Sequence, residues 1–247
     1  MPTAAAVHLA ETEARRNVYA DILSQAVTGE LIGMANYAAM AELCGDPESQ
    51  EDAVEHAYNE RGHAAAFRRL AKDLGVPIIV DPAAPYWRRI REAFLRQVRA
   101  GDLSACLIVQ ELMLESFAVS MYLAVAEAAD GKMSQVFRAI SKEEEGHLQH
   151  AIDELTPELH RDAAAFEAKV GRLHDEVMTI LAEMVAARDP AGACGLCRGE
   201  CVKGSLHHIG LTAPELRGRA LNYYLKVLDR MGIGGEVSLS WVANLPV

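Results

Sequence analysis

Apolar residues recur every three or four positions along nearly the whole chain, and stretches in which apolar and polar residues alternate are scarce. This spacing lines up an apolar stripe on one face of a helix, so the sequence predicts helices throughout and no strand-rich region. Alanine, leucine, glutamate, arginine and methionine, which favour helices, are abundant. We therefore predict one all-α domain over residues 1–247.

Glycine, proline and aspartate residues divide this pattern into segments. Gly75 with Pro77 just beyond it is typical of a helix C-terminus, and Thr156-Pro157 is expected to end the fifth helix. An extended connector is expected at 76–84, a loop-like segment at about 190–211, and a glycine-rich turn with a short apolar tail at the end. The expected helices, about seven or eight in all, include 10–44, 49–74, 85–101, 102–129, 132–155, a stretch ending at 188, and 213–231.

Composition narrows the class of protein. Hydrophobic residues make up 51% of the chain, which is too many for a disordered protein, and the net charge of −11 disfavours binding to nucleic acids or anionic membranes. Uncharged stretches such as Leu31–Ala41 are much shorter than the roughly 20 residues of a spanning helix, and the N-terminus does not resemble a signal peptide. Five cysteines are an odd number, which argues against a framework in which every cysteine forms a disulfide. We expect a cytoplasmic protein with no transmembrane segment.

Two Glu-x-x-His motifs, Glu60–His63 and Glu144–His147, lie on predicted helices. Residues three apart share a helix face, so the carboxylate and imidazole of each pair can reach the same metal ion. About one such motif is expected by chance in a chain of this composition. The motifs alone are therefore weak support for a metal site.

The order of the glutamates strengthens the prediction. Glu30 and Glu115 each lie in the middle of an apolar helix, about 30 residues before one of the two motifs. A charged side chain there is costly unless it is paired or bound to metal. A lone glutamate followed by Glu-x-x-His, repeated after a crossover, is typical of the two-metal site of a ferritin-like four-helix bundle. The alternative is that the glutamates are solvated and the histidines are hydrogen-bonded core residues. That alternative explains any one of these residues well, but it explains all six in this order poorly.

This donor set favours a particular chemistry. Four carboxylates and two imidazoles bind iron or manganese readily, and open coordination positions admit O₂. We therefore predict a ferritin-like four-helix bundle core with additional helices, holding two Fe ions or a Mn/Fe pair.

Several stretches around these residues carry a more specific resemblance. They are Gly29-Glu30, Asn36-Tyr37, Glu60-Arg-Gly-His63, Cys106-Leu-Ile-Val-Gln110, Glu115-Ser-Phe117-Ala118 and Glu144-Glu-Gly-His147-Leu148. In them the chain resembles the aldehyde-deformylating oxygenases, also called aldehyde decarbonylases, a branch of the ferritin-like di-iron proteins. The resemblance covers about residues 15–160 and, more weakly, the last helix. It implies that the metal ligands are Glu30, Glu60, His63, Glu115, Glu144 and His147.

The resemblance also implies a reaction and its partners. A long-chain fatty aldehyde, lying in an apolar channel, would react with O₂ and electrons from a ferredoxin-type donor to give formate and an alkane one carbon shorter. Tyr122 matches a family tyrosine that either lines the substrate side of the metals or bonds a ligand, with ordinary core packing as the alternative. Gln110 either orients part of the site or makes an ordinary bond between helices. We expect a monomer or small homo-oligomer.

Glu111 departs from the family pattern, which usually has a small apolar residue at this position. It lies four residues before Glu115 and so on nearly the same helix face. It is either an extra ligand or a solvated acid at the edge of the bundle. The second interpretation is preferred, because single helical glutamates are mostly solvated.

A cysteine segment is the larger departure. Cys194, Cys197 and Cys201 lie within eight residues, and His207 and His208 follow. These residues suit a Cys₃His zinc site, an iron–sulfur cluster that passes electrons to the helical site, or free or redox-active thiols.

Two other functions fit the same ligand order. One is a di-iron oxygenase that acts on a different small molecule by hydroxylation, N-oxygenation or oxidative C–C cleavage. The other is a non-enzymatic iron-handling or redox-sensing protein.

Overall fold

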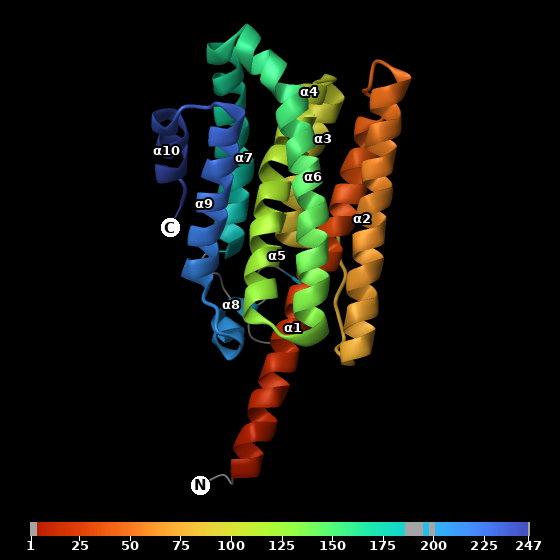
Figure 1. The fold of residues 1–247 in the computed structure, drawn as a ribbon, viewed down its shortest axis with the longest axis vertical. Coiled ribbons are helices and arrows are strands. Elements are labelled where there is room, and N and C mark those ends of the chain that lie inside the picture. Colours follow the sequence, from red (N-terminus) through yellow and green to blue (C-terminus); the bar gives the residue numbers. More distant parts are fainter. Residues whose placement is uncertain (1–3, 186–194, 198–200, 247) are drawn as a thin grey trace.

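The computed structural model describes residues 4–185, 195–197 and 201–246, and within them every regular element is a helix. The all-α prediction is confirmed. The core consists of two helical hairpins that lie side by side (Figure 1). One hairpin pairs α1 (Ala4–Met40) with α2 (Pro47–Leu74). The other pairs α6 (Gly131–Arg161) with a continuous helix made of α4 (Leu103–Leu107), the π-helix η1 (Ile108–Glu115) and α5 (Ser116–Ala128).

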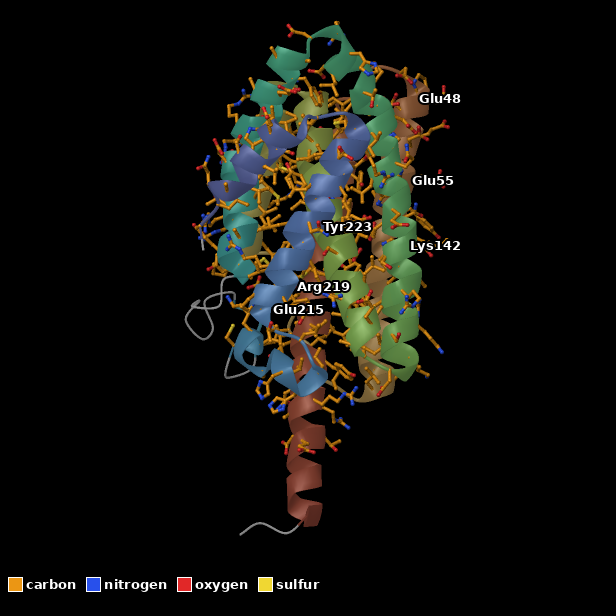
Figure 2. The ribbon with its side chains drawn as sticks, turned by 60° about the vertical axis from the view of Figure 1, so that its left-hand side comes forward. Glu48, Glu55, Lys142, Glu215, Arg219 and Tyr223 are labelled. Atoms are coloured by element: carbon orange, nitrogen blue, oxygen red, sulfur yellow. The ribbon has the colours of Figure 1, made fainter. Side chains whose placement is uncertain are left out.

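The remaining helices cover this four-helix core. They are α3 (Pro85–Ala100), α7 (Ala163–Val185), the short α8 (Val202–Ser205) with the 3₁₀ turn η2 (Leu206–Ile209), α9 (Ala213–Met231) and α10 (Gly235–Ala243). Figure 1 shows α9 beside α5, α10 at the outer side of α9, and the first turns of α1 extending beyond the bundle. Polar contacts attach α9: Arg219 and Tyr223, labelled in Figure 2, donate hydrogen bonds to Glu127 of α5 and Glu145 of α6.

Local capping explains where α2 begins and where α2 and α3 end, close to the predicted positions, whereas α1 ends at Met40, four residues before the predicted Cys44. The side chain of Asp46 accepts a hydrogen bond from the backbone N–H of Ser49 at the start of α2. Gly75 and Gly101 end α2 and α3 in the left-handed conformation, with φ of 63° and 68°, which glycine adopts without steric cost.

The prediction that the fifth helix ends before Thr156 is wrong, because α6 continues through Pro157 to Arg161. A proline inside a helix costs roughly 3 kcal/mol, whereas burial of a leucine side chain contributes about 1.5–3 kcal/mol. Leu155 and Leu159 are both buried in this part of α6. Their burial offsets the cost, and the hydroxyl of Thr156 donates to the carbonyl oxygen of Ile152.

Two further segments contain more helix than the sequence predicted. The apolar tail forms α10, whose Trp241 packs against His174 of α7 with ring centres 5.9 Å apart. The part of the loop-like segment that is described contains α8 and η2, and Leu206 and Ile209 of η2 are buried. Burial of these apolar residues stabilises short helices whose local sequence is rich in glycine.

Buried apolar residues form two clusters with polar residues between them. One cluster includes Tyr37 and the other includes Tyr122, and each tyrosine hydroxyl donates toward a buried glutamate. The continuous helix Leu103–Ala128 is, among the described residues, the one long and apolar enough to span a membrane, but 78% of its most apolar window is buried in the bundle. It forms the centre of the core, and that arrangement leaves a polar layer inside the protein.

Candidate metal centre

All four helices of the core contribute to one buried polar cluster. Its members are Glu30 from α1, Glu60 and His63 from α2, Glu115 from the end of η1, and Glu144 and His147 from α6. Each of these six residues is at most 4% exposed to solvent. The structure therefore brings together all six residues that the sequence predicted as ligands, including both Glu-x-x-His pairs.

The six residues form two overlapping groups. In each group the potential ligand atoms lie within 4.8 Å of one another, and Glu60 and Glu144 belong to both. One group adds Glu30 and His63, and the other adds Glu115 and His147. This is the arrangement expected for two adjacent metal ions that share two bridging carboxylates.

Both imidazoles turn the same ring nitrogen toward the carboxylates. Nδ1 of His63 lies 2.9 Å from Oε1 of Glu144 and 3.3 Å from Oε2 of Glu30. Nδ1 of His147 lies 2.9 Å from Oε2 of Glu144 and 3.4 Å from Oε1 of Glu60. Glu144 thus lies between the two histidines, with one oxygen toward each.

The carboxylates compete for ionisation because they are buried together. Burial, and after it the charge of Glu144, raises the pKa of Glu60 and of Glu115 well above the ordinary value. Burial favours the neutral form of Glu144 as well, but the imidazoles of His147 and His63 beside it hold the pKa of this carboxyl at about 2. Since like charges at this separation oppose one another, the cluster needs positive charge for all four carboxylates to ionise.

The donor atoms fit a pair of metal ions. Among the described residues, buried atoms that have no hydrogen-bond partner include Oε2 of Glu30, Oε1 of Glu60, Nδ1 of His63, Oε2 of Glu144 and Nδ1 of His147. Unpartnered polar atoms at full burial are costly, and here they gather at one place. Metal ions would satisfy these atoms and neutralise the carboxylates. Carboxylate and imidazole donors are those that iron and manganese accept.

A chain of hydrogen bonds holds Glu115 in place. Gln110 donates from Nε2 to Oε1 of Glu115 at 2.7 Å, and its own Oε1 accepts from Asn36. Arg91 of α3 donates to Oδ1 of Asn36. Gln110 therefore both contacts a predicted ligand and bonds a neighbouring helix, as the two interpretations of the sequence had it. The role of Arg91 was missed, because nothing local in the sequence links α3 to this site.

Two buried tyrosines contact the cluster from opposite ends. Tyr122 donates its hydroxyl to Oε1 of Glu30, and Tyr37 donates to Oε1 of Glu115 at 3.4 Å. Burial, followed by the charge of Glu30, raises the pKa of Tyr122 well above its ordinary value. Tyr122 is therefore a neutral donor that holds Glu30, and a bond to a predicted ligand is one of the three roles that the sequence left open.

Glu143 is a contact that the sequence analysis missed. Its Oε2 lies 2.9 Å from Nε2 of His63, while its side chain is 64% exposed. A carboxylate on the outer nitrogen of a metal-binding histidine fixes the ring orientation and makes the ring a stronger donor. The run Glu143-Glu144-Glu145 contained the signal, but it resembled an ordinary solvated acidic face.

Glu111 is not a solvated acid at the edge of the bundle, so that preference was wrong. Its side chain is fully buried in η1, with Nδ1 of His150 at 2.7 Å and Nδ1 of His56 at 3.4 Å. π-helical turns are wider than α-helical ones and often occur at functional sites. Burial of the Glu111 carboxylate is tolerated because two imidazoles face it. Glu111 lies about one helical turn before Glu115.

A largely apolar cavity of about 170 Å³ adjoins the cluster. Glu30, Glu60 and Glu115 lie in its wall, together with apolar side chains that include Ile22, Phe117 and Met121. Tyr122 and Gln110 line it as well. A molecule with an apolar chain and a polar end can therefore lie with its polar end at the carboxylates.

The cysteine segment lies in part against the same cavity. Cys201, Lys203 and Leu206 line the wall, whereas Cys194 lies outside the described residues. Cys197 accepts a hydrogen bond from the backbone N–H of Val202, and the ring centres of His207 and His208 lie 4.0 Å apart with the rings tilted by 39°. In the part of the segment that is described, these cysteines and histidines form no group of three ligand atoms. A zinc or iron–sulfur site in this segment stays a prediction.

Comparisons with known proteins agree with the fold. Residues 12–187 match the sequence profile of the family described as long-chain fatty aldehyde decarbonylase. A solved structure of a protein with aldehyde deformylating oxidase activity from Synechococcus superposes with a TM-score of 0.78. The superposition covers 93% of this chain and 96% of that chain, at 20% sequence identity.

Proposed function

The chain belongs to the long-chain fatty aldehyde decarbonylase family, and we propose that it is an O₂-dependent non-haem di-iron oxygenase. In its specific form it converts a long-chain fatty aldehyde to an alkane and formate. The observation that carries the proposal is the pair of overlapping Glu/His groups, of which Glu30, Glu60 and Glu115 lie in the wall of the apolar cavity.

The proposed metal ligands follow from the two groups. Glu30 and His63 would hold one ion, Glu115 and His147 the other, and Glu60 and Glu144 would bridge them. Two iron ions, or a Mn/Fe pair, would supply the redox chemistry for O₂ that the protein side chains lack.

The surrounding residues would position the reactants. The apolar side chains of the cavity bind the hydrocarbon chain and exclude water, which strengthens electrostatic interactions at the carboxylate end. Tyr122 holds Glu30 by its hydroxyl, and Gln110 holds Glu115. Both contacts keep a ligand carboxylate in one orientation while a substrate occupies the cavity.

The proposed reaction requires reducing equivalents from outside. One aldehyde, one O₂, four electrons and four protons give one alkane, one formic acid and one water. The C–C bond next to the carbonyl breaks, the carbonyl carbon leaves as formate, and the alkyl carbon gains hydrogen. We propose a ferredoxin-type donor for the electrons, and a cytoplasmic monomer or small homo-oligomer as the working form.

The test uses iron-loaded full-length protein, a ferredoxin with its reductase, and octadecanal under ¹⁸O₂. We expect heptadecane, and formate that carries one ¹⁸O atom. Glu115→Ala should lose product, while Gly146→Ala, in which the added methyl group meets no atom within 4 Å, should retain it. Formate without ¹⁸O, or product that does not depend on iron, would contradict the proposal.

A second candidate is a di-iron oxygenase with a different substrate. Cys201 and Lys203 add a thiol and a cation to a cavity wall that is largely apolar apart from the carboxylates and their neighbours, and such groups suit a substrate with a second polar function. Iron-dependent O₂ consumption without alkane across aldehyde chain lengths would favour this candidate. Slow iron oxidation and a large assembly, without any substrate oxidation, would instead indicate the iron-handling function.

A further inference from the structure

His56, Glu111 and His150 form a third cluster, beside the six residues described above. One potential ligand atom from each lies within 4.8 Å of the others. Oε2 of Glu111 is 2.7 Å from Nδ1 of His150, and Oε1 is 3.4 Å from Nδ1 of His56. The residues come from α2, η1 and α6, so three separate helices converge on one carboxylate.

The cluster repeats the ligand pattern one helical turn away. His56 precedes Glu60 by four residues, Glu111 precedes Glu115 by four, and His150 follows His147 by three. Residues at these spacings are neighbours on a helix face. The rings of His56 and His147 are accordingly only 4.4 Å apart. The bundle therefore carries a second layer of donors next to the first.

Two buried atoms in this layer have no partner. Oε1 of Glu111 and Nδ1 of His56 are both buried without a hydrogen bond, although they face each other. Glu111 is fully buried, so neither water nor solvent ions satisfy this oxygen at the surface. A purely structural ion pair would be expected to use both carboxylate oxygens, whereas here only Oε2 is hydrogen-bonded.

We propose that His56, Glu111 and His150 bind a third metal ion, a divalent first-row transition metal held by two imidazoles and one carboxylate. Two donors on one such ion, each at about 2.1 Å, lie roughly 3.0–3.4 Å apart, which is close to the separations observed. Two histidines with one carboxylate are the ligands of many zinc and iron(II) sites.

The surroundings favour a cation and give it access. The side chains of His56 and His150 are 16% and 29% exposed, whereas that of Glu111 has no exposure. The negative charges of Glu154 and Asp52 act on His150 from nearby. An ion from solvent can therefore reach the imidazoles first and the buried carboxylate behind them.

The test counts metal ions in the full-length protein. Metal-free protein is saturated with Zn²⁺, freed of excess ion by gel filtration and analysed by plasma mass spectrometry. We expect His150→Gln to hold one equivalent fewer than the wild-type protein. His160→Gln, which changes an exposed histidine of the same helix, should hold as many as the wild type. Circular dichroism shows whether each variant is folded.

Zinc anomalous diffraction on crystals of the wild-type protein locates the ion. The proposal requires a peak between Nδ1 of His56 and the carboxylate of Glu111, in addition to the peaks at the six-residue cluster. Equal zinc content in His150→Gln and wild-type protein, or no peak at this position, would overturn the proposal and leave the cluster as a structural ion pair. Failure of aldehyde conversion has no bearing on this result, so the proposed function and the third site are tested separately.

Discussion

Gly33 offers a test of how the proposed metal centre is built. It is a buried residue of α1, close to one turn after Glu30. A methyl group added here would lie 2.8 Å from Oε2 of Glu60 and 3.0 Å from its Cδ, where ordinary contact begins near 3.4 Å. Gly33 thus leaves the space that the Glu60 carboxylate occupies.

The Gly33→Ala substitution has opposite effects on stability and on metal binding. Alanine is favoured over glycine inside a helix by about 1 kcal/mol. The carboxylate of Glu60, at the end of a flexible side chain, must move by roughly 0.6 Å to restore ordinary contact, which exceeds the ~0.5 Å tolerance of a preorganised site. We expect the folding stability of the metal-free protein to be unchanged or slightly higher. Metal affinity should fall about 10- to 100-fold, the effect of disturbing a ligand's support.

Gly62→Ala and Gly146→Ala are matched controls. Each glycine lies on the exposed side of a Glu-x-Gly-His motif, and a methyl group at either position meets no atom within 4 Å. Both should raise the thermal midpoint of unfolding by about 2–4 °C, as ~1 kcal/mol does in a chain of this length, with metal affinity unchanged. Affinity is measured by competition with a chelator and stability by thermal unfolding of metal-free protein. A folded Gly33→Ala protein that binds two metal ions with wild-type affinity would refute the reasoning.

Three further predictions test the surroundings of the site. Tyr122→Phe removes the hydroxyl that holds Glu30, so metal affinity should fall about 10-fold with two ions still bound at saturation; unchanged affinity would assign Tyr122 to packing alone. Ala118→Phe narrows the cavity wall, so turnover of long-chain aldehydes should fall more than turnover of short ones, and equal losses would contradict the cavity as the substrate site. In the metal-free protein, burial lowers the pKa of His63, but the adjacent carboxylates of Glu144 and Glu30 favour the charged imidazole and raise the pKa to about 11. The charged imidazole therefore stabilises the fold fully below about pH 6.5 and less as pH rises toward 11. The thermal midpoint should fall across this range without metal, and a flat profile would contradict the prediction.

The local sequence pattern was sufficient to predict most of the helices and to select the six residues that we propose as ligands. The three- and four-residue apolar spacing indicates helices, and caps such as Asp46 and Gly75 depend on residues a few positions away. The residues of a Glu-x-x-His motif share a face wherever the helix lies. The order of Glu30 and Glu115 before the two motifs then favoured one shared metal site over a set of unrelated solvated glutamates and core histidines.

Tertiary packing decided whatever depended on other helices. Pro157 was expected to end α6, but the buried leucines around it keep the segment helical. Glu111 was expected at the edge of the bundle, and only the packing of α2 and α6 against η1 places His56 and His150 beside it.

The same distinction separates the six-residue cluster from everything that supports it. Sequence spacing determines which side chains share one helix face, because the geometry of a single helix is regular. Which faces meet depends on how the apolar stripes of all the helices pack together, and no local pattern records the outcome. The bonds from Arg91 through Asn36 to Gln110, the cavity and the third cluster therefore became visible only in the folded protein.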